Sequence, residues 1–320
     1  MAVQRSLSKS ESTALSMVRV FAMILIISCH IAQCYNLQIA YIFNVGVQIF
    51  FFMSGFLYGK QKQMPSVKGF YLKRFVRVYI PYFVLLVIIL AVYAVFNLTS
   101  FNLKQVLFYL LSLQWFVAPI EGLNHLWFLT VLMFGYLLTP WIKRVMEKAP
   151  IACAVLFVCC CVVEFVFLKK FYSLSAWLAL YLLGLFYGKY HSKTVSTIAL
   201  VASSIALIVL YLFLEPSKLT SFEDRHYMIW LHWTLGVFLF VLLYHVLPLM
   251  IGENKSFAGI RHLDKISSEV YLIHHPLILG PLSLMFVTKV AGLNIVLMLV
   301  VTYLLARVLN YICSFTKTLV

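Results

Sequence analysis

The feature that most constrains the fold is a succession of long apolar segments through almost the whole chain. About ten segments reach roughly 20 residues, the length that an α-helix needs to cross the ~30 Å hydrocarbon core of a bilayer. A content of 63% hydrophobic and 11% charged residues excludes an ordinary soluble domain. We therefore predict an all-α, polytopic bundle of transmembrane helices, organised as one membrane-embedded domain over residues 1–320. The expected spans are 15–35, 41–60, 76–97, 123–142, 150–168, 172–189, 194–214, 226–250, 266–288 and 291–313.

The distribution of basic residues predicts the topology. With the N-terminus inside, nineteen of the 25 Lys and Arg residues fall on the cytoplasmic side and six outside, as the positive-inside rule requires. Both termini are then cytoplasmic, and the formal charge of +15 needs no nucleic-acid partner. The stretch 98–122 is too short in its apolar part to cross, so we expect an external, interfacial or re-entrant helix there.

Two ionisable residues occur in the first apolar segment. Arg19 and His30 are eleven residues apart, which places them on one helix face about 16 Å apart along the axis. Ionisable groups in a membrane cost about 2.5–3.5 kcal/mol on insertion scales, so they usually face a bundle interior or a wet cavity. The pair predicts a functional site. The alternative is that Arg19 reaches the headgroups and His30 is a hydrogen-bonded packing residue.

A cationic segment follows the second span. Residues 60–81 carry six basic residues and no acid, and Lys73, Arg74 and Arg77 fall within one turn of each other. One interpretation is topology and contact with anionic headgroups. The other is a site for a phosphorylated ligand, because arginine binds phosphate in a bidentate manner.

Polar and aromatic residues mark two further spans. Asn124, His125 and Trp127 open the fourth span at its external end, either as an aromatic belt or as an acceptor-binding cleft. In the ninth span His274 and His275 lie about 12–14 Å into the core, measured at 1.5 Å per residue. Adjacent helical residues point about 100° apart, so we expect at most one of them to share a cavity with His30. No carboxylate or cysteine is placed convincingly with them, and we predict no metal site.

Five motifs in one order resemble the acyltransferase 3 family of integral membrane O-acyltransferases. They are Arg19-x10-His30, the run 50–56 (FFFMSGF), the run 73–81 (KRFVRVYIP), the run 125–129 (HLWFL) and the run 271–274 (YLIH). The resemblance covers essentially the whole chain. Met17-Val18 stands where relatives often have an acidic residue before the arginine. The fourth motif continues as Thr130-Val131-Leu132, without the glutamate of one large subgroup, and this form resembles a smaller, single-domain branch.

The resemblance implies transfer of an acyl group, usually acetyl from acetyl-CoA, to a hydroxyl of a cell-envelope or surface polysaccharide. It implies a multi-pass protein of the bacterial inner membrane, with acyl-CoA and an envelope carbohydrate as partners. His30 would be the general base or form a transient acyl-histidine, and Arg19 would orient the donor. Lys73, Arg74 and Arg77 would bind its phosphates. Asn124, His125, Trp127 and His274 would bind the acceptor.

The sequence is also compatible with a second class of function. A transporter or polymerase of lipid-linked glycans also uses intramembrane arginines, histidines and an internal pathway. No inverted repeat is evident in the sequence, and interrupted spans are sparse. Dependence on acyl-CoA separates the two classes. The acyl group, the acceptor hydroxyl and the oligomeric state are not determined by these residues.

Overall fold

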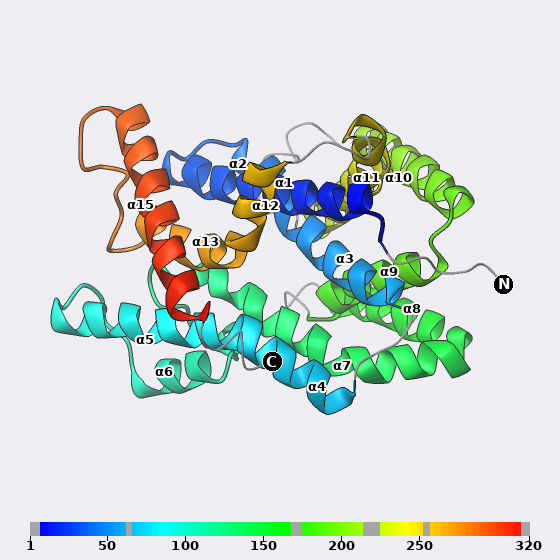
Figure 1. The fold of residues 1–320 in the computed structure, drawn as a ribbon, viewed down its shortest axis with the longest axis horizontal. Helices are drawn as coiled ribbons and strands as arrows, with labels where there is room; N and C mark the ends of the chain where they lie inside the picture. Colours follow the sequence, from blue (N-terminus) through cyan, green and yellow to red (C-terminus); the bar gives the residue numbers. More distant parts are fainter. Residues whose placement is uncertain (1–6, 62–65, 168–173, 214–224, 252–256, 315–320) are drawn as a thin grey trace. The chain divides into compact units, whose positions relative to one another are not determined.

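The computed structural model describes residues 7–61, 66–167, 174–213, 225–251 and 257–314 (Figure 1). Within these residues the elements are all helical, as expected. In chain order they are α1 (Lys9–Cys34), α2 (Ala40–Phe43), α3 (Val45–Lys60), α4 (Val67–Arg74), the π-helix η1 (Phe75–Tyr79), α5 (Ile80–Val95), α6 (Leu103–Leu110), the 3-10 turns η2 (Gln114–Phe116) and η3 (Asn124–Leu126), α7 (Trp127–Lys148), α8 (Pro150–Phe167), α9 (Leu174–Tyr190), α10 (Lys193–Phe213), α11 (Arg225–Ile251), α12 (Ala258–Lys265), α13 (Ser267–His274), α14 (Pro276–Leu279) and α15 (Ala291–Ile312).

Seven helices in the described residues are long and apolar enough to cross a membrane. They are Lys9–Cys34, Ala40–Lys60, Val67–Val95, Asn124–Lys148, Lys193–Leu210, Trp230–Ile251 and Ala291–Ile312. The expected fifth span corresponds to a shorter apolar helix, Pro150–Glu164, and the sixth to α9. The chain ends predicted to be cytoplasmic include 1–6 and 315–320, which lie outside the described residues.

The expected ninth span, 266–288, is not one continuous helix, so this part of the prediction was wrong. Helix α13 has eight residues and α14 has four, and α14 ends at Gly280 in extended backbone. Pro276 starts α14, and proline has no N–H to donate to the preceding turn. In the stretch 98–122, α6 and η2 are both too short to cross, as expected.

The chain divides into two compact units. The first contains the described parts of Met1–Cys29, Gln38–Gln63 and Leu138–Asp264, and the second those of His30–Leu37, Met64–Leu137 and Lys265–Val320. Helices α1 and α7 each contribute to both units. The two units are described separately below.

Close contact between α3 and α9 forms the core of the first unit. A Cβ added at Gly55 would collide with the backbone oxygen of Tyr181, and one added at Gly184 would collide with that of Phe52. Gly59 and Gly188 meet in the same way one turn later. Small residues let helix backbones approach in this manner in membrane proteins.

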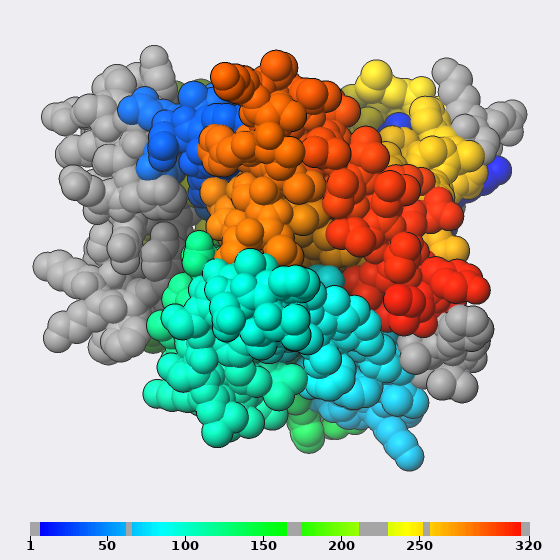
Figure 2. Space-filling model, turned by 90° about the vertical axis from the view of Figure 1, so that its left-hand side faces the viewer, coloured from blue at the N-terminus to red at the C-terminus, as the bar shows by residue number. Residues whose placement is uncertain are grey.

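In the second unit α13 packs against α5 and α15. The carboxylate of Glu269 on α13 is fully buried, and it accepts hydrogen bonds from Asn310 on α15 (2.8 Å) and from Ser268 (2.7 Å). A buried carboxylate needs such partners because it has lost its hydration. In Figure 2, α5 and α6 (cyan) and α15 (orange to red) reach the surface. Many of the exposed α15 side chains are apolar, as a lipid-facing helix requires.

Candidate active site

Four histidine rings meet in the second unit. His30 comes from α1, His125 from η3, His274 from the last position of α13 and His275 from the residue that precedes α14. The ring centroid of His30 lies 5.2 Å from that of His274 and 4.6 Å from that of His275. His125 lies 5.3 Å from His274 and 4.6 Å from His275. We call these four residues the histidine cluster.

The expectation that only one of the adjacent histidines shares a site with His30 was wrong. His274 and His275 point in different directions, with ring centroids 6.2 Å apart and planes at 85°. His30 lies at similar distances from both, so it occupies the sector between them. The 100° angle between neighbouring helical side chains is therefore compatible with two contacts to a ring placed between them.

Hydrogen bonds determine which nitrogen carries the proton in three of these rings. His125 Nε2 faces the carbonyl oxygen of Leu272 (3.2 Å), His274 Nδ1 that of Tyr271 (2.7 Å) and His275 Nδ1 that of Gly122 (2.8 Å). A carbonyl oxygen only accepts, so each of these nitrogens donates, and the other nitrogen of each neutral ring is a lone-pair acceptor.

His30 has the same arrangement through a side chain. Its Nδ1 lies 2.8 Å from Oε1 of Gln33, one turn further along α1. With Nδ1 donating to this amide oxygen, Nε2 of His30 is the unprotonated nitrogen. His30 thus presents a potential base or nucleophile at Nε2.

Two acceptor nitrogens of the cluster are buried without a hydrogen-bond partner, Nδ1 of His125 and Nε2 of His274. An unsatisfied buried polar atom costs about 1–3 kcal/mol, and such atoms in a native fold call for an explanation. A ligand that brings O–H or N–H donors would satisfy them. Within the described residues, no group of three or more His, Cys, Asp or Glu side chains is arranged to hold a metal ion.

Contacts of the backbone at and before η3 hold the histidine cluster in place. Within η3, the carbonyl oxygen of His125 accepts a hydrogen bond from the hydroxyl of Tyr271 on α13 (2.5 Å). Gly122 has φ +75°, a conformation that glycine adopts without strain. A Cβ there would lie 2.7 Å from the hydroxyl of Tyr93 and 2.8 Å from Cα of Gly280. Only glycine lets this segment approach the backbone of Gly280 so closely.

Arg19 lies in the first unit and has an acidic partner. Its guanidinium forms an ion pair with the carboxylate of Asp264 on α12, and the hydroxyl of Ser16 donates to the same carboxylate at 2.7 Å. The side chains of Arg19 and Asp264 are 28% and 15% exposed, so the pair is largely removed from water. The two partners of this ion pair are 245 residues apart in the chain.

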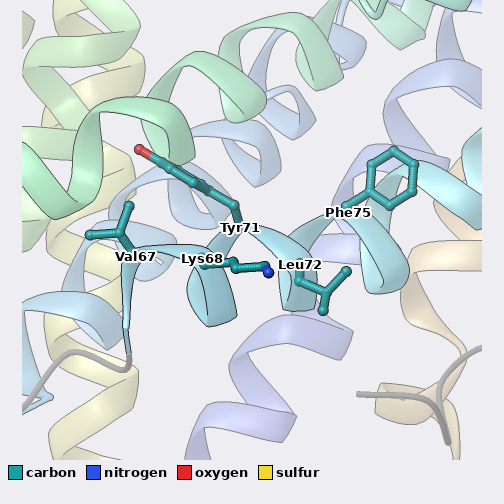
Figure 3. Close-up of a pocket in the computed structure, with 5 residues that line it drawn as sticks. All are labelled: Val67, Lys68, Tyr71, Leu72 and Phe75. Carbon is teal, nitrogen blue, oxygen red and sulfur yellow. The ribbon is translucent and has the colours of Figure 1, made fainter.

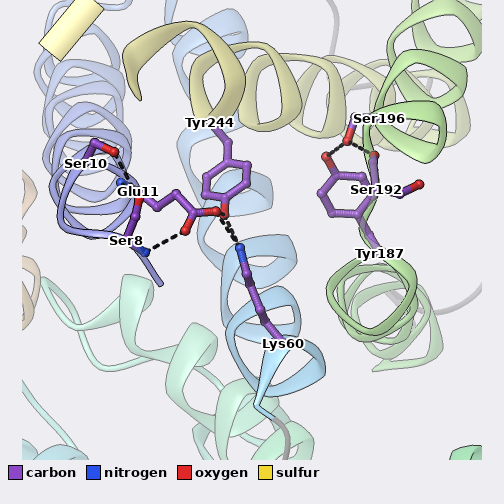
Figure 4. A network of polar contacts seen from close by, with 8 residues as sticks. All are labelled: Ser8, Ser10, Glu11, Lys60, Tyr187, Ser192, Ser196 and Tyr244. Atoms are coloured by element: carbon purple, nitrogen blue, oxygen red, sulfur yellow. Dashed lines mark hydrogen bonds and ion pairs between the residues drawn. The ribbon is translucent and has the colours of Figure 1, made fainter. Parts of the chain in front are cut away.

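A second polar network lies in the first unit, around the start of α1 (Figure 4). Nζ of Lys60 and the hydroxyl of Tyr244 each lie 2.7 Å from Oε1 of Glu11. The same figure shows the hydroxyl pair Tyr187 and Ser196, 2.9 Å apart. Lys60, counted among the basic residues of the cationic segment, is therefore neutralised by Glu11.

Lys68, Lys73, Arg74 and Arg77 lie in the second unit, around a π-helical turn, whereas Lys62 lies outside the described residues. The N–H of Ile80 bonds to the carbonyl of Phe75, the i→i+5 pattern, directly before Pro81. Proline cannot donate and its ring crowds the preceding turn, which a wider π-turn accommodates. Lys73 lies in α4 and Arg77 in this π-turn. Arg77 is exposed and Lys73 half-buried.

Arg74 lies against aromatic rings. Its guanidinium carbon lies 5.7 Å from the ring centroid of Phe70 and 5.5 Å from that of Tyr136. Cation–π contacts of this kind orient a guanidinium, so the two rings help to set the direction of the Arg74 side chain.

A hollow of about 550 Å³ lies on the same segment (Figure 3). Tyr71 is fixed there by a 2.7 Å hydrogen bond from its hydroxyl to the carbonyl of Leu137. The surface of the hollow is apolar and aromatic, and Lys68 is its one charged lining residue. Its lining residues are Val67, Lys68, Tyr71, Leu72 and Phe75.

The three residues predicted at the start of the fourth span have different surroundings. His125 is buried in the histidine cluster, whereas Asn124 is exposed. Trp127 is half-buried and meets Trp115 edge to face at 5.4 Å. The structure thus brings together three of the predicted residues, His30, His125 and His274. Asn124 and Trp127 are within two residues of His125 in the sequence.

Three residues of these sites were missed by sequence reasoning. His275 was discounted by the angular argument, Asp264 lies in a short polar helix remote from Arg19, and Gln33 was not considered. For Gln33 a signal was available, because its i+3 spacing from His30 predicts side-chain contact on a helix. No comparable signal pointed to Asp264.

A family model described as an acyltransferase domain matches residues 13–316. No curated protein and no solved structure matches the chain. The matched region contains the whole histidine cluster, Arg19 with Asp264, and the segment around Arg74 and Arg77.

Proposed function

Because the chain belongs to the acyltransferase 3 family, we propose that it is a membrane O-acetyltransferase with acetyl-CoA as its donor. The acetyl group passes from cytoplasmic acetyl-CoA to a hydroxyl of a cell-envelope or surface polysaccharide. The family and the apolar helices establish a multi-pass membrane acyltransferase. The donor, the carbohydrate acceptor and the bacterial inner membrane are parts of the proposal.

The observation that carries the proposal is the contact between Nδ1 of His30 and Oε1 of Gln33, which leaves Nε2 of His30 as a base within the histidine cluster. In the proposed reaction His30 Nε2 takes the proton of the acceptor hydroxyl while the oxygen attacks the thioester carbonyl. The new C–O bond forms, the C–S bond breaks, and the proton passes from His30 to the departing sulfur of CoA. In the variant mechanism Nε2 itself attacks the thioester and an acyl-histidine passes the acetyl group on.

The acceptor side of the site is assigned to His125 and His274. Their partnerless nitrogens accept hydrogen bonds, so they select a ligand with hydroxyl donors. A carbohydrate offers several such donors. The exposed amide of Asn124 and the indole of Trp127 extend this surface, since aromatic faces stack well on sugar rings.

The donor side is assigned to the cationic segment. Arg77, Arg74 and Lys73 bind the phosphates of CoA, and the hollow beside Tyr71 and Phe75 receives its apolar or aromatic parts. Arg19 orients the donor, and Asp264 holds the guanidinium of Arg19 in place.

The test is release of free CoA by purified protein in vesicles supplied with acetyl-CoA, with and without envelope polysaccharide. We expect release that requires the polysaccharide and is lost in His30→Ala. His232→Ala is the matched control, because His232 is also a buried histidine bonded to a carbonyl, that of Tyr41, but lies in the first unit.

Substantial release by folded His30→Ala protein would overturn the role of His30. If folded wild-type protein releases no CoA from any acyl-CoA, the transferase itself is excluded and glycan transport becomes the better assignment. Succinyl-CoA is included as a donor to define the acyl group.

A further inference from the structure

His30 differs from the other members of the histidine cluster in what holds it. Backbone carbonyls of Leu272, Tyr271 and Gly122 fix the other three rings. His30 alone is fixed by a side chain, through the 2.8 Å contact between its Nδ1 and Oε1 of Gln33. The orientation of the ring assigned to catalysis therefore depends on one replaceable group.

The contact is local and well placed. Gln33 follows His30 by three residues on α1, so both side chains lie on one helix face. Both are half-buried, and the rings of His274 and His275 have their centroids 5.2 Å and 4.6 Å from that of His30. An amide oxygen in this position can accept the Nδ1–H of His30 without bringing a charged side chain into a membrane-embedded site.

We propose that Gln33 is a positioning residue that keeps His30 in its Nδ1–H tautomer and aims Nε2 at the acyl donor and the acceptor hydroxyl. The inference rests on the proposed function. A neutral imidazole without this partner divides between two tautomers, and only one of them presents Nε2 as a base. When His30 takes up the acceptor's proton, the amide oxygen also stabilises the charged ring through Nδ1–H.

Gln33→Leu and Gln33→Glu test this role. Leucine is similar in size but has no acceptor, so kcat should fall about 10–100-fold, the loss typical when a histidine that ligates a metal loses the group bonded to its other nitrogen. KM for acetyl-CoA should stay near the wild-type value. Glutamate keeps the acceptor and adds charge, so Gln33→Glu should retain more activity than Gln33→Leu. A carboxylate stabilises the imidazolium and so raises the pKa of His30. The acidic limb of the profile of kcat against pH should therefore move to higher pH in Gln33→Glu. Gln38→Leu is the control, since Gln38 is exposed five residues further on.

Two outcomes would overturn the inference. One is Gln33→Leu protein with wild-type kcat and an unchanged pH profile. The other is a Gln33→Glu profile whose acidic limb does not move, which remains measurable if Gln33→Leu fails to fold. His30→Ala is measured in the same series. Activity that survives in His30→Ala defeats the proposed function, whereas activity lost there but intact in Gln33→Leu defeats only the role of Gln33.

Discussion

The imidazole of His275 donates from Nδ1 to the backbone carbonyl of Gly122, 2.8 Å away and 153 residues earlier in the chain. This bond joins the segment before η3 to the start of α14 within the second unit. Gly122 is at φ +75°, so the bond depends on a backbone conformation that side chains disfavour. The orientation of His275 is thus coupled to the conformation of one glycine.

Gly122→Ala should therefore impair both stability and activity. A left-handed conformation costs about 1–2 kcal/mol for a residue with a Cβ, and the new atom would press on Tyr93 and Gly280. We expect a lower thermal unfolding temperature in detergent and slower CoA release per folded molecule. Gly292→Ala is the control, because a Cβ at Gly292 meets nothing within 4 Å. Equal behaviour of the two variants would contradict the coupling.

Gly184→Ala should destabilise the first unit. The added methyl group would collide with the backbone oxygen of Phe52 on α3, which cannot move aside as a flexible side chain would. Overpacking of this kind costs about 1–3 kcal/mol. Thermal unfolding followed by tryptophan fluorescence measures the loss, again with Gly292→Ala as control. An unchanged unfolding temperature would show that α3 and α9 are less closely packed than described.

Asp264→Asn tests the partner of Arg19. Removing the carboxylate leaves a largely buried guanidinium without its counter-charge, which should cost about 2 kcal/mol, between the values for exposed and buried pairs. A double-mutant cycle of Arg19→Gln and Asp264→Asn isolates the coupling from the effect of each residue alone. If Arg19 orients the donor, Arg19→Gln also raises KM for acetyl-CoA. Additive stability changes in the cycle would argue against the ion pair.

Arg77→Gln tests the donor site. Loss of one phosphate contact should raise KM for acetyl-CoA about tenfold, equivalent to about 1.4 kcal/mol, with little change in kcat. The effect should weaken at high salt because the interaction is ionic. Lys104→Gln is the control, since Lys104 lies over the ring of Phe108 in the segment predicted to be external. A rise in KM of the same size in both variants would indicate a general charge effect.

His191, between α9 and α10, should make the first unit sensitive to acid. Burial lowers the pKa of His191 to about 4, with further lowering by the charges of Lys60 and His245 and a smaller opposing effect of Glu11. The unfolded chain takes up this proton near the ordinary pKa of 6.5, so unfolding binds a proton between about pH 6.5 and pH 4. Stability should fall as the pH is lowered through that window and should not depend on this group above it.

Thermal unfolding at pH 5 and pH 7.5 measures this effect. His191→Phe keeps an aromatic ring beside Tyr187 and Tyr244 but has no proton to take up. The difference in unfolding temperature between the two pH values should therefore be smaller in His191→Phe than in the wild type. An identical difference would assign the acid sensitivity to other groups.

The sequence by itself determined that this is a helical membrane protein and which family it resembles. In a bilayer every backbone group must be bonded within its segment, so an apolar run of about 20 residues has one outcome, a helix. Local spacing likewise placed Arg19 and His30 on one helix face and concentrated basic charge before Pro81. These properties depend on neighbours within a few turns, and periodicity is enough to predict them.

Only the tertiary structure decided which side chains meet. His30, His125 and His274 are at least 95 positions apart from one another in the chain. Asp264, which pairs with Arg19, lies 245 residues further along the chain. The break at Pro276 and the φ of Gly122 then set the approach of the rings. Contacts of this kind depend on how helices pack and where they end, and packing is decided by the shapes of surfaces that are remote in sequence.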